Sequence, residues 1–179
     1  MTQIKYGLFL GAIGALCAVL IAATNNLTAP IIRYNQEASI REAIAVVFPE
    51  MGDFETLASV DNGDEIAEPT IQEIQQIFGH DGETLGYIFT QATSGFGGPM
   101  LYIIGLDATG HIEGFSVISH GETPGIGAFI TYPEFQVELH GRSISEPIDI
   151  HSGATVTSTT IRAAFAGLSD YFDANHGGN

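Results

Sequence analysis

Residues 149–158 read DIHSGATVTS, a stretch of small and hydroxyl-bearing residues without a basic side chain. It runs into a pattern in which Ile161, Phe165, Leu168 and Phe172 are spaced by four, three and four residues. This spacing places the four large side chains on one face of a helix. Hydroxyl-bearing residues before such a face are typical of a helix N-terminus. The sequence therefore predicts an amphipathic helix that begins within this stretch.

The start of this helix also has the properties of an anion site. The first backbone N–H groups of a helix have no partner inside it, and the helix dipole places positive charge there, which together favour a phosphate. Gly153 and Ala154 would let a ligand approach the backbone closely. The alternative is an ordinary capped helix after a turn, and these features alone do not separate the two.

The middle of the chain predicts antiparallel strands. Residues 71–77 fit either a strand or a short helical turn, and residues 129–137 indicate a weaker strand or turn that Pro133 interrupts. The clearest strands are rich in β-branched and aromatic residues and are separated by turn sequences. They are predicted at residues 85–91, 101–106 and 112–118, with turns at 80–83 and 107–110. With helices near both ends of the chain, the fold class is α+β with three or four strands.

The N-terminal segment predicts a membrane anchor. No charged residue occurs between Tyr6 and Ile32. The apolar core of this run, residues 6–24, would extend about 28 Å as a helix, close to the hydrocarbon thickness of a bilayer. A cleaved signal peptide is the alternative, but the run is long for one and residues 22–24 form a poor cleavage site. We therefore expect an uncleaved transmembrane helix.

A soluble domain is expected after this anchor. Residues 25–30 predict a linker, which places the anchor and linker at residues 1–30 and the domain at residues 31–179. Residues 31–48 predict a helix that Pro49 ends. Residues 54–68 are acidic and rich in turn residues, which favours a solvated loop. A calcium site there is the alternative, but the spacing of the carboxylates does not fit a calcium-binding loop.

The formal net charge of −16 limits the function classes. So acidic a chain repels the phosphates of nucleic acids, which argues against nucleic-acid binding. It also repels anionic lipid, so contact with a membrane must come from insertion. Cys17 is the single cysteine, and the six histidines show no close pairing. We therefore expect no disulfide and no metal site.

Two further glycine-rich segments follow predicted strands, SGFGGP at residues 94–99 and HGETPGIG at residues 120–127. The first lacks the Lys and the following Ser or Thr of a phosphate-binding P-loop and does not open a βαβ unit, so we reject that function. Either segment is explained by a tight turn at a strand end. Both also have the backbone access that a ligand loop requires.

Three motifs, in order behind a membrane anchor, resemble one protein family. Asp149-x-x-Ser152-Gly153-Ala154-Thr155 resembles the flavinylation motif of membrane-anchored FMN-binding proteins, namely the G subunit of the Rnf complex and the C subunit of the sodium-pumping NADH:quinone reductase. Residues 122–127, ETPGIG, and residues 95–98, GFGG, resemble further segments of that family. The quinone-reductase protein usually carries extra segments that this shorter chain lacks, so the resemblance to the Rnf protein is preferred.

This resemblance implies a covalent cofactor. The hydroxyl of Thr155 would carry FMN through a phosphoester bond, formed by a separate flavin transferase that uses FAD and Mg²⁺. Asp149 would serve recognition by that transferase. The residues expected around the bound FMN come from the two motifs nearest to it. They are Ser152, Gly153, Ala154, Val156 and Thr157, together with Glu122, Thr123, Gly125 and Gly127 beside the flavin ring.

The resemblance also implies a function without substrate turnover by the chain itself, and no catalytic residue is expected. The protein would transfer electrons within an ion-translocating ferredoxin:NAD⁺ oxidoreductase, and its partners would be the membrane subunits of that complex. Its N-terminus would lie in the cytoplasm and its domain outside the inner membrane. Two alternatives stay open: the C subunit of the quinone reductase, and a non-redox binding module anchored in the membrane.

Overall fold

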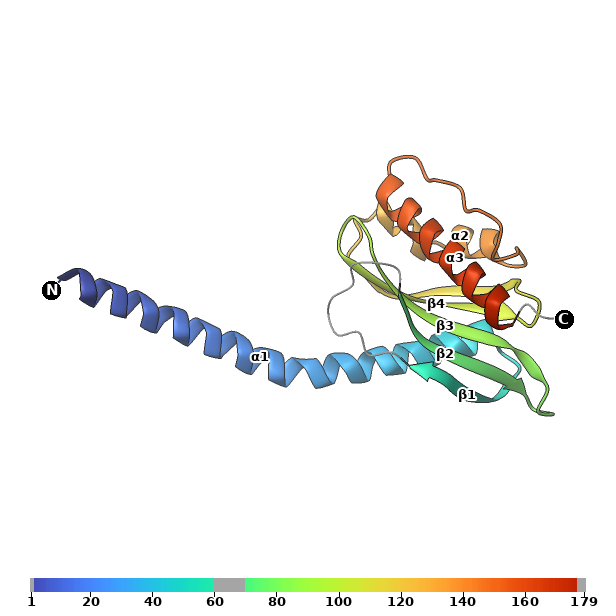
Figure 1. Cartoon of the computed structure of the whole chain (residues 1–179), viewed down its shortest axis with the longest axis horizontal. Coiled ribbons are helices and arrows are strands. Elements are labelled where there is room, and N and C mark those ends of the chain that lie inside the picture. The colour runs from blue at the N-terminus through green and yellow to red at the C-terminus, as the bar shows by residue number, and fades with distance from the viewer. Residues whose placement is uncertain (1, 60–69, 177–179) are drawn as a thin grey trace. The chain divides into compact units, whose positions relative to one another are not determined.

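A computed structural model describes residues 2–59 and 70–176, without the side chains of residues 2–4, 33, 36 and 37. The chain divides into two compact units, residues 1–39 and residues 40–179. The first unit is purely helical in its described part, and the second contains a sheet with helices (Figure 1). The N-terminal helix belongs to both units, because it begins in the first and ends in the second.

This helix, α1 (Thr2–Val47), contains the predicted membrane span. Within it, Lys5–Ile32 is the one segment in the described part of the chain that is long and apolar enough to cross a membrane. Its 28 residues would extend about 42 Å, more than the ~30 Å of a bilayer's hydrocarbon core. None of the residues of this segment is buried. A helix of this kind meets the requirements of an anchor.

Residues 25–30, which the sequence predicts as a linker, are helical, because α1 continues through them and through Pro30. Two hydroxyl-bearing side chains at this stretch bond to the helix itself. The hydroxyl of Thr24 donates to the Leu20 carbonyl at 2.9 Å, and that of Thr28 donates to the Thr24 carbonyl at 2.9 Å. Such bonds to the preceding turn let hydroxyl-bearing residues remain helical. The helix predicted over residues 31–48 is confirmed as the end of α1.

The second unit is built on one antiparallel sheet of five strands, in the spatial order β1-β2-β3-β4-β5 (Figure 1). Each strand pairs with the next along the chain, so the sheet is a simple meander. The strands are β1 (Met51–Ser59), β2 (Thr70–Gly79), β3 (Thr84–Ser94), β4 (Pro99–Asp107) and β5 (Ile112–His120). The α+β class and the three clearest predicted strands are confirmed, and residues 71–77 are a strand.

Strand β1 was not predicted. The loop expected over residues 54–68 is wrong for residues 54–59, and residues 60–68 lie outside the described residues. Strand β1 forms the edge of the sheet, and its side chains are almost all exposed. Its pairing with β2 supplies backbone hydrogen bonds that do not depend on an apolar pattern, and charged residues are common on such edges. Because its composition is acidic, this strand could not be recognised from the sequence.

Three helices follow the sheet: the 3-10 helix η1 (Gly127–Thr131), α2 (Pro133–Leu139) and α3 (Thr155–Asn175). The strand or turn predicted over residues 129–137 is wrong. Pro133 is the first residue of α2, where its fixed φ angle favours a helix and its missing N–H costs nothing. The predicted amphipathic helix near the C-terminus is confirmed, since Ile161, Phe165, Leu168 and Phe172 of α3 are all buried.

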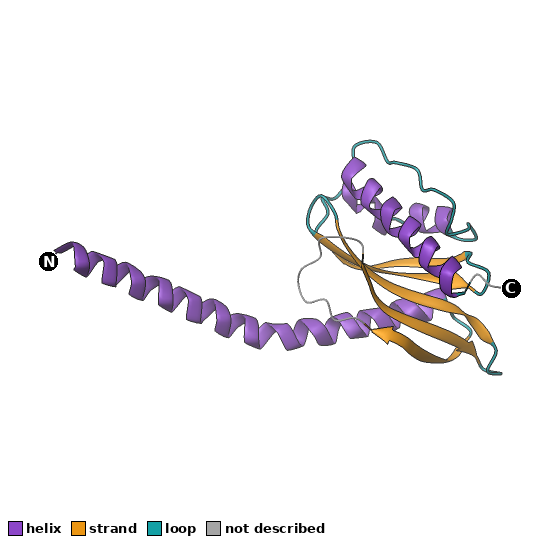
Figure 2. Cartoon of the chain, in the orientation of Figure 1, coloured by secondary structure: helices purple, strands orange, loops and turns teal. Residues whose placement is uncertain are grey.

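Each face of the sheet is covered by helix (Figure 2). Helices α2 and α3 pack on one face and enclose the larger hydrophobic core. The end of α1 packs on the other face through Ile44, Val47 and Phe48. Gly105 and Gly114 lie opposite each other in β4 and β5, where a Cβ on either would collide with Val47. These glycines allow the last turn of α1 to lie directly on the sheet.

Candidate functional site

The three glycine-rich segments meet around one cavity of about 310 Å³. Phe96 comes from the turn between β3 and β4, and Glu122, Thr123, Ile126 and Gly127 come from the segment after β5. The remaining wall is the start of α3, from Gly153 to Thr157. Segments that are about 25 to 60 residues apart in the chain therefore form a single site.

The start of α3 leaves its first backbone N–H groups available. Ala154 is the N-cap residue and provides no side-chain bond to them. The Ser158 hydroxyl donates to the Ala154 carbonyl at 2.9 Å and accepts from the His151 N–H at 3.1 Å, which fixes the entry into the helix. Gly153 has a φ of 87°, a conformation that favours glycine. The first turn thus faces the cavity with free donors and the positive end of the helix dipole.

Glu122 connects all three segments through its carboxylate. Its side chain is only 5% exposed. One oxygen accepts from the Gly97 N–H at 2.9 Å, and the other accepts from the Thr157 hydroxyl at 2.7 Å. A Cβ on Gly95 or on Gly127 would collide with this carboxylate. These glycines are therefore required by the approach of Glu122.

The hydroxyls at the start of α3 differ in their availability. Thr157 is 1% exposed and its hydroxyl is engaged by Glu122, while Ser158 is buried and bonded to the backbone. Thr155, the first residue of α3, is exposed and lines the cavity. Ser152 is exposed but is not part of the cavity wall. Among the hydroxyl-bearing residues of α3's first turn, Thr155 is the one that is both exposed and in the wall.

Exposed apolar side chains border the same cavity. Phe96 is 75% exposed, Ile126 is 51% exposed and Val156 is 50% exposed. Exposed large apolar residues that gather around a cavity indicate a ligand with apolar surface. Phe96 and Ile126 were missing from the predicted contacts, although both lie inside the motifs that carried the resemblance. The sequence could not predict these two contacts, because a motif does not show which of its residues face a cavity.

The other predicted residues fall into two groups. Gly153, Ala154, Val156, Thr123 and Gly127 line the cavity. Gly125 does not: its φ is 77°, and its N–H donates to the Tyr132 hydroxyl at 3.2 Å, so it shapes the turn. Asp149 is exposed and lies outside the wall. Gly125, Asp149 and Ser152 therefore belong to the motifs but do not line the cavity.

The charge of the cavity is negative. Among the described residues that line it, none is basic and Glu122 is the single acidic one. An anionic ligand would thus find only backbone N–H groups and hydroxyls, beside a buried carboxylate. A charged phosphate held without a covalent bond would have no cation to neutralise it.

Comparison with known proteins matches both parts of the chain. Residues 95–168, which include every residue of the cavity wall, match the FMN-binding domain family. Residues 1–47, which correspond to α1, match the N-terminal region of RnfG. The fold and site thus define an FMN-binding domain that follows an apolar N-terminal helix.

Relatives of known name cover most of the chain. The G subunit of the ion-translocating oxidoreductase complex from Methanosarcina acetivorans is 29% identical over 92% of each chain. The G subunit of the Na⁺-translocating ferredoxin:NAD⁺ oxidoreductase complex from Acetobacterium woodii is 31% identical over 84% of this chain and 75% of its own. The chain belongs to the RnfG family, the G subunits of Rnf complexes.

A solved structure is also similar in part. The C subunit of the Na⁺-translocating NADH-quinone reductase from Parabacteroides distasonis is 28% identical, with a TM-score of 0.46 over 56% of this chain and 61% of that one.

Proposed function

We propose that this chain is the electron-transferring G subunit of an Rnf-type ion-translocating complex and carries FMN on Thr155 through a phosphoester. Membership of the RnfG family and the FMN-binding domain match support the general function. The observation that carries the attachment site is the exposed Thr155 hydroxyl in the cavity wall, at the start of α3. The neighbouring hydroxyls of Thr157 and Ser158 are buried and engaged.

The electrostatics of the site favour a covalent bond over reversible binding. The cavity wall offers no cation to an FMN phosphate, and the chain carries a formal charge of −16. A covalent bond keeps the cofactor in place whatever its intrinsic affinity. The free N–H groups of α3's first turn would still stabilise the phosphodiester charge. The same positive helix end would thus hold a phosphate that the side chains alone do not attract.

Formation of the bond requires a second protein. In the proposed transfer, Thr155 Oγ1 attacks the FMN phosphorus of FAD, the anhydride bond breaks, AMP leaves and the hydroxyl proton passes to a base. The carboxylate that lines the cavity, Glu122, is already bonded to Gly97 and Thr157, so it is not free to act as that base. A flavin transferase with Mg²⁺ would supply the base and the metal. Asp149 is exposed outside the cavity, where such an enzyme can reach it.

The chain's own residues would then hold and shield the cofactor. Bound FMN supplies the redox chemistry by accepting and passing on electrons. Phe96, Ile126 and Val156 would offer apolar surface to the flavin, and Thr123 would offer a hydroxyl as a polar contact. Glu122 fixes the three segments relative to one another. The chain would therefore transfer electrons without converting a substrate, while ion translocation would belong to the whole complex.

Purification from the native membrane tests the proposed partners. A tagged chain, extracted in mild detergent from cells that contain the whole complex, is expected to copurify with the other membrane subunits of an Rnf-type complex. Mass spectrometry of the purified sample identifies them. Copurification with a sodium-pumping NADH:quinone reductase instead, or recovery of the chain alone, would contradict the assignment.

The membrane topology follows from the same proposal. Segment Lys5–Ile32 would anchor the chain in the inner membrane, with the N-terminus in the cytoplasm and the FMN-binding domain outside. Protease added to intact spheroplasts is then expected to digest the domain, as seen by immunoblot. A cytoplasmic protein serves as the control for intact cells. A domain that stays protected until the cells are lysed would reverse the orientation.

A further inference from the structure

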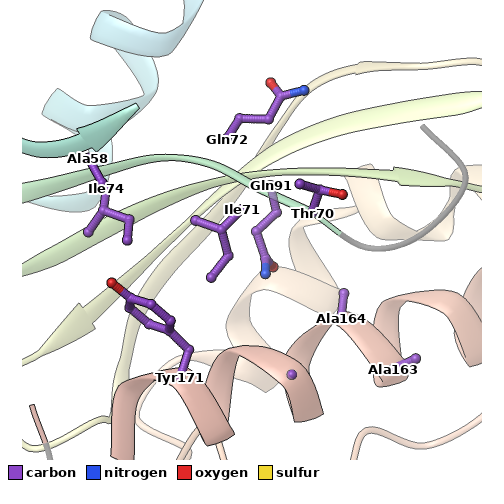
Figure 3. Close-up of a pocket in the computed structure, with 10 residues that line it drawn as sticks. Ala58, Thr70, Ile71, Gln72, Ile74, Gln91, Ala163, Ala164 and Tyr171 are labelled. Atoms are coloured by element: carbon purple, nitrogen blue, oxygen red, sulfur yellow. The ribbon is translucent and has the colours of Figure 1, made fainter. Parts of the chain in front are cut away.

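A second and larger cavity lies between the sheet and α3, away from the proposed FMN site. Its volume is about 600 Å³, and it shares no lining residue with the cavity at Thr155. Ile71 and Ile74 of β2 and Gln91 of β3 form one wall, and α3 forms the other. Figure 3 shows Ile71 and Gln91 extending from the sheet toward α3, and Tyr171 rising from α3 toward the sheet.

The cavity exists because α3 presents small side chains to this part of the sheet. Ala163, Ala164 and Gly167 lie on the lining face of the helix. At Gly167 an added Cβ would meet no atom within 4 Å, so the space beside the helix is open. These residues begin about 12 Å along the helix axis from Thr155, given a rise of about 1.5 Å per residue. A ligand here would occupy a site separate from that of a flavin on Thr155.

Gln91 gives this cavity a specific polar feature. Its side chain is 2% exposed, and its Oε1 atom has no hydrogen-bond partner among the described residues. A buried acceptor without a partner is unfavourable, because it has lost its hydrogen bonds to water without gaining another. The side chain lines the cavity and, in Figure 3, directs its amide into it. A ligand with a hydroxyl or N–H group would satisfy this atom.

The remaining lining sets the charge of that ligand. None of the described lining residues is acidic or basic, and six of the ten are Ile, Ala or Tyr. An ion placed there would lose its hydration without gaining a countercharge. The volume lies within the range of small-molecule sites, about 300–1,000 Å³. The lining therefore fits a neutral ligand that is mostly apolar.

We propose that this cavity is a second binding site, for a neutral and mainly apolar small molecule that donates one hydrogen bond to Gln91 Oε1. The aromatic ring of Tyr171 and the side chains of Ile71 and Ile74 contact its apolar part. The site does not depend on the flavin or on Thr155. Its ligand is bound reversibly, since the described lining residues include no Cys, Lys or other charged side chain that would react with it unaided.

Methyl NMR of the full chain in lipid nanodiscs tests this site. With ¹³C-methyl-labelled isoleucine, 4-fluorophenol is expected to shift the signals of Ile71 and Ile74 in a saturable way. Fluorobenzene, which has the same ring but no hydroxyl, is expected to bind about tenfold more weakly, because it leaves Gln91 Oε1 unpaired. Probe dissolved in the lipid is the same for every variant, and the two probes are compared at equal free concentrations, measured with protein-free nanodiscs.

Two substitutions decide the assignment. Gly167→Leu fills open space on a helix that tolerates leucine well, so the variant should fold and lose the shifts from both probes. Gln91→Leu should remove the preference for 4-fluorophenol, so that both probes bind equally. The proposal is overturned by shifts that do not saturate, by shifts that survive Gly167→Leu, or by a hydroxyl preference that survives Gln91→Leu. If Gln91→Leu does not fold, the Gly167→Leu result and the probe comparison still decide.

Discussion

Thr155→Ala is expected to yield a full-length protein without covalent flavin, even in a host that supplies the flavin transferase. The substitution removes the oxygen atom that the phosphoester requires. Thr155 is exposed and is the first residue of α3, so its hydroxyl does not pack in the core. The variant should therefore fold like the wild type. Ultraviolet fluorescence of the denatured protein in a gel measures the outcome. The wild-type band should fluoresce, and the variant band should not.

Two controls make this result specific. Thr155→Ser keeps a hydroxyl at the same position and is expected to retain fluorescence. Thr159→Ala removes an exposed hydroxyl from the next turn of the same helix, outside the cavity wall, and should leave loading unchanged. Fluorescence that persists in Thr155→Ala would move the attachment to another residue. A wild-type band without fluorescence would favour a non-redox binding module.

Gly127→Ala is expected to destabilise the domain by about 2–4 kcal/mol and to reduce flavin loading. The new methyl group would overlap the Glu122 carboxylate and lie 2.9 Å from the Thr157 hydroxyl. Glu122 would have to leave its place and would lose its bonds to Gly97 and Thr157. Because those bonds hold the start of α3, Thr155 would also lose its position. Urea unfolding of the solubilised chain, followed by circular dichroism, measures the stability.

Gly167→Ala provides the matched control for this substitution. It adds the same methyl group at a site where nothing lies within 4 Å, inside a helix that favours alanine over glycine. Its effect should therefore be stabilising, by up to about 1 kcal/mol. Glu122→Asp shortens the carboxylate and should reduce the cost of Gly127→Ala, because the two residues are coupled. An equal cost in both backgrounds would show that the collision with Glu122 is not the cause.

Periodic patterns explain the parts of the fold that could be predicted. The four apolar residues from Ile161 to Phe172 indicated α3 because a buried helix face must repeat every three to four residues. Strands β3 to β5 carry β-branched and aromatic residues between turns, and they form the centre and one edge of the sheet. Apolar composition and length indicated α1 up to residue 24. For α3 and the strands, burial in the core requires the pattern that the sequence displays.

The elements that were missed depend on contacts the sequence does not display. Strand β1 is acidic and exposed, and its place is set by pairing with β2. Helix α2 has only seven residues, so Pro133 looked like an interruption when it is the first residue of the helix. The polar end of the apolar run stays helical because Thr24 and Thr28 bond to their own helix. Local composition alone indicated a loop at residues 54–68, a strand or turn at residues 129–137 and a linker at residues 25–30.

The candidate site also has features that the sequence predicted and features that it could not predict. The motif at residues 149–155 predicted a helix start suited to a phosphate, and resemblance supplied a role for Thr155. Neither could show that Glu122 joins the three glycine-rich segments, since the bonds to Gly97 and Thr157 span 25 and 35 residues. The position of Phe96 in the cavity wall could not be predicted either, because nothing in the sequence places its ring there. The second cavity at Gln91 has no sequence motif at all.

Peptide mass spectrometry tests the attachment of FMN to Thr155 most directly. The chain is purified from a host with the transferase, digested and fragmented without reduction of the flavin. The peptide containing Thr155 is expected to be heavier by one FMN less one water, with fragment ions that place the addition on Thr155. An unmodified peptide, or an addition on Ser152, Thr157 or any other residue, would contradict it.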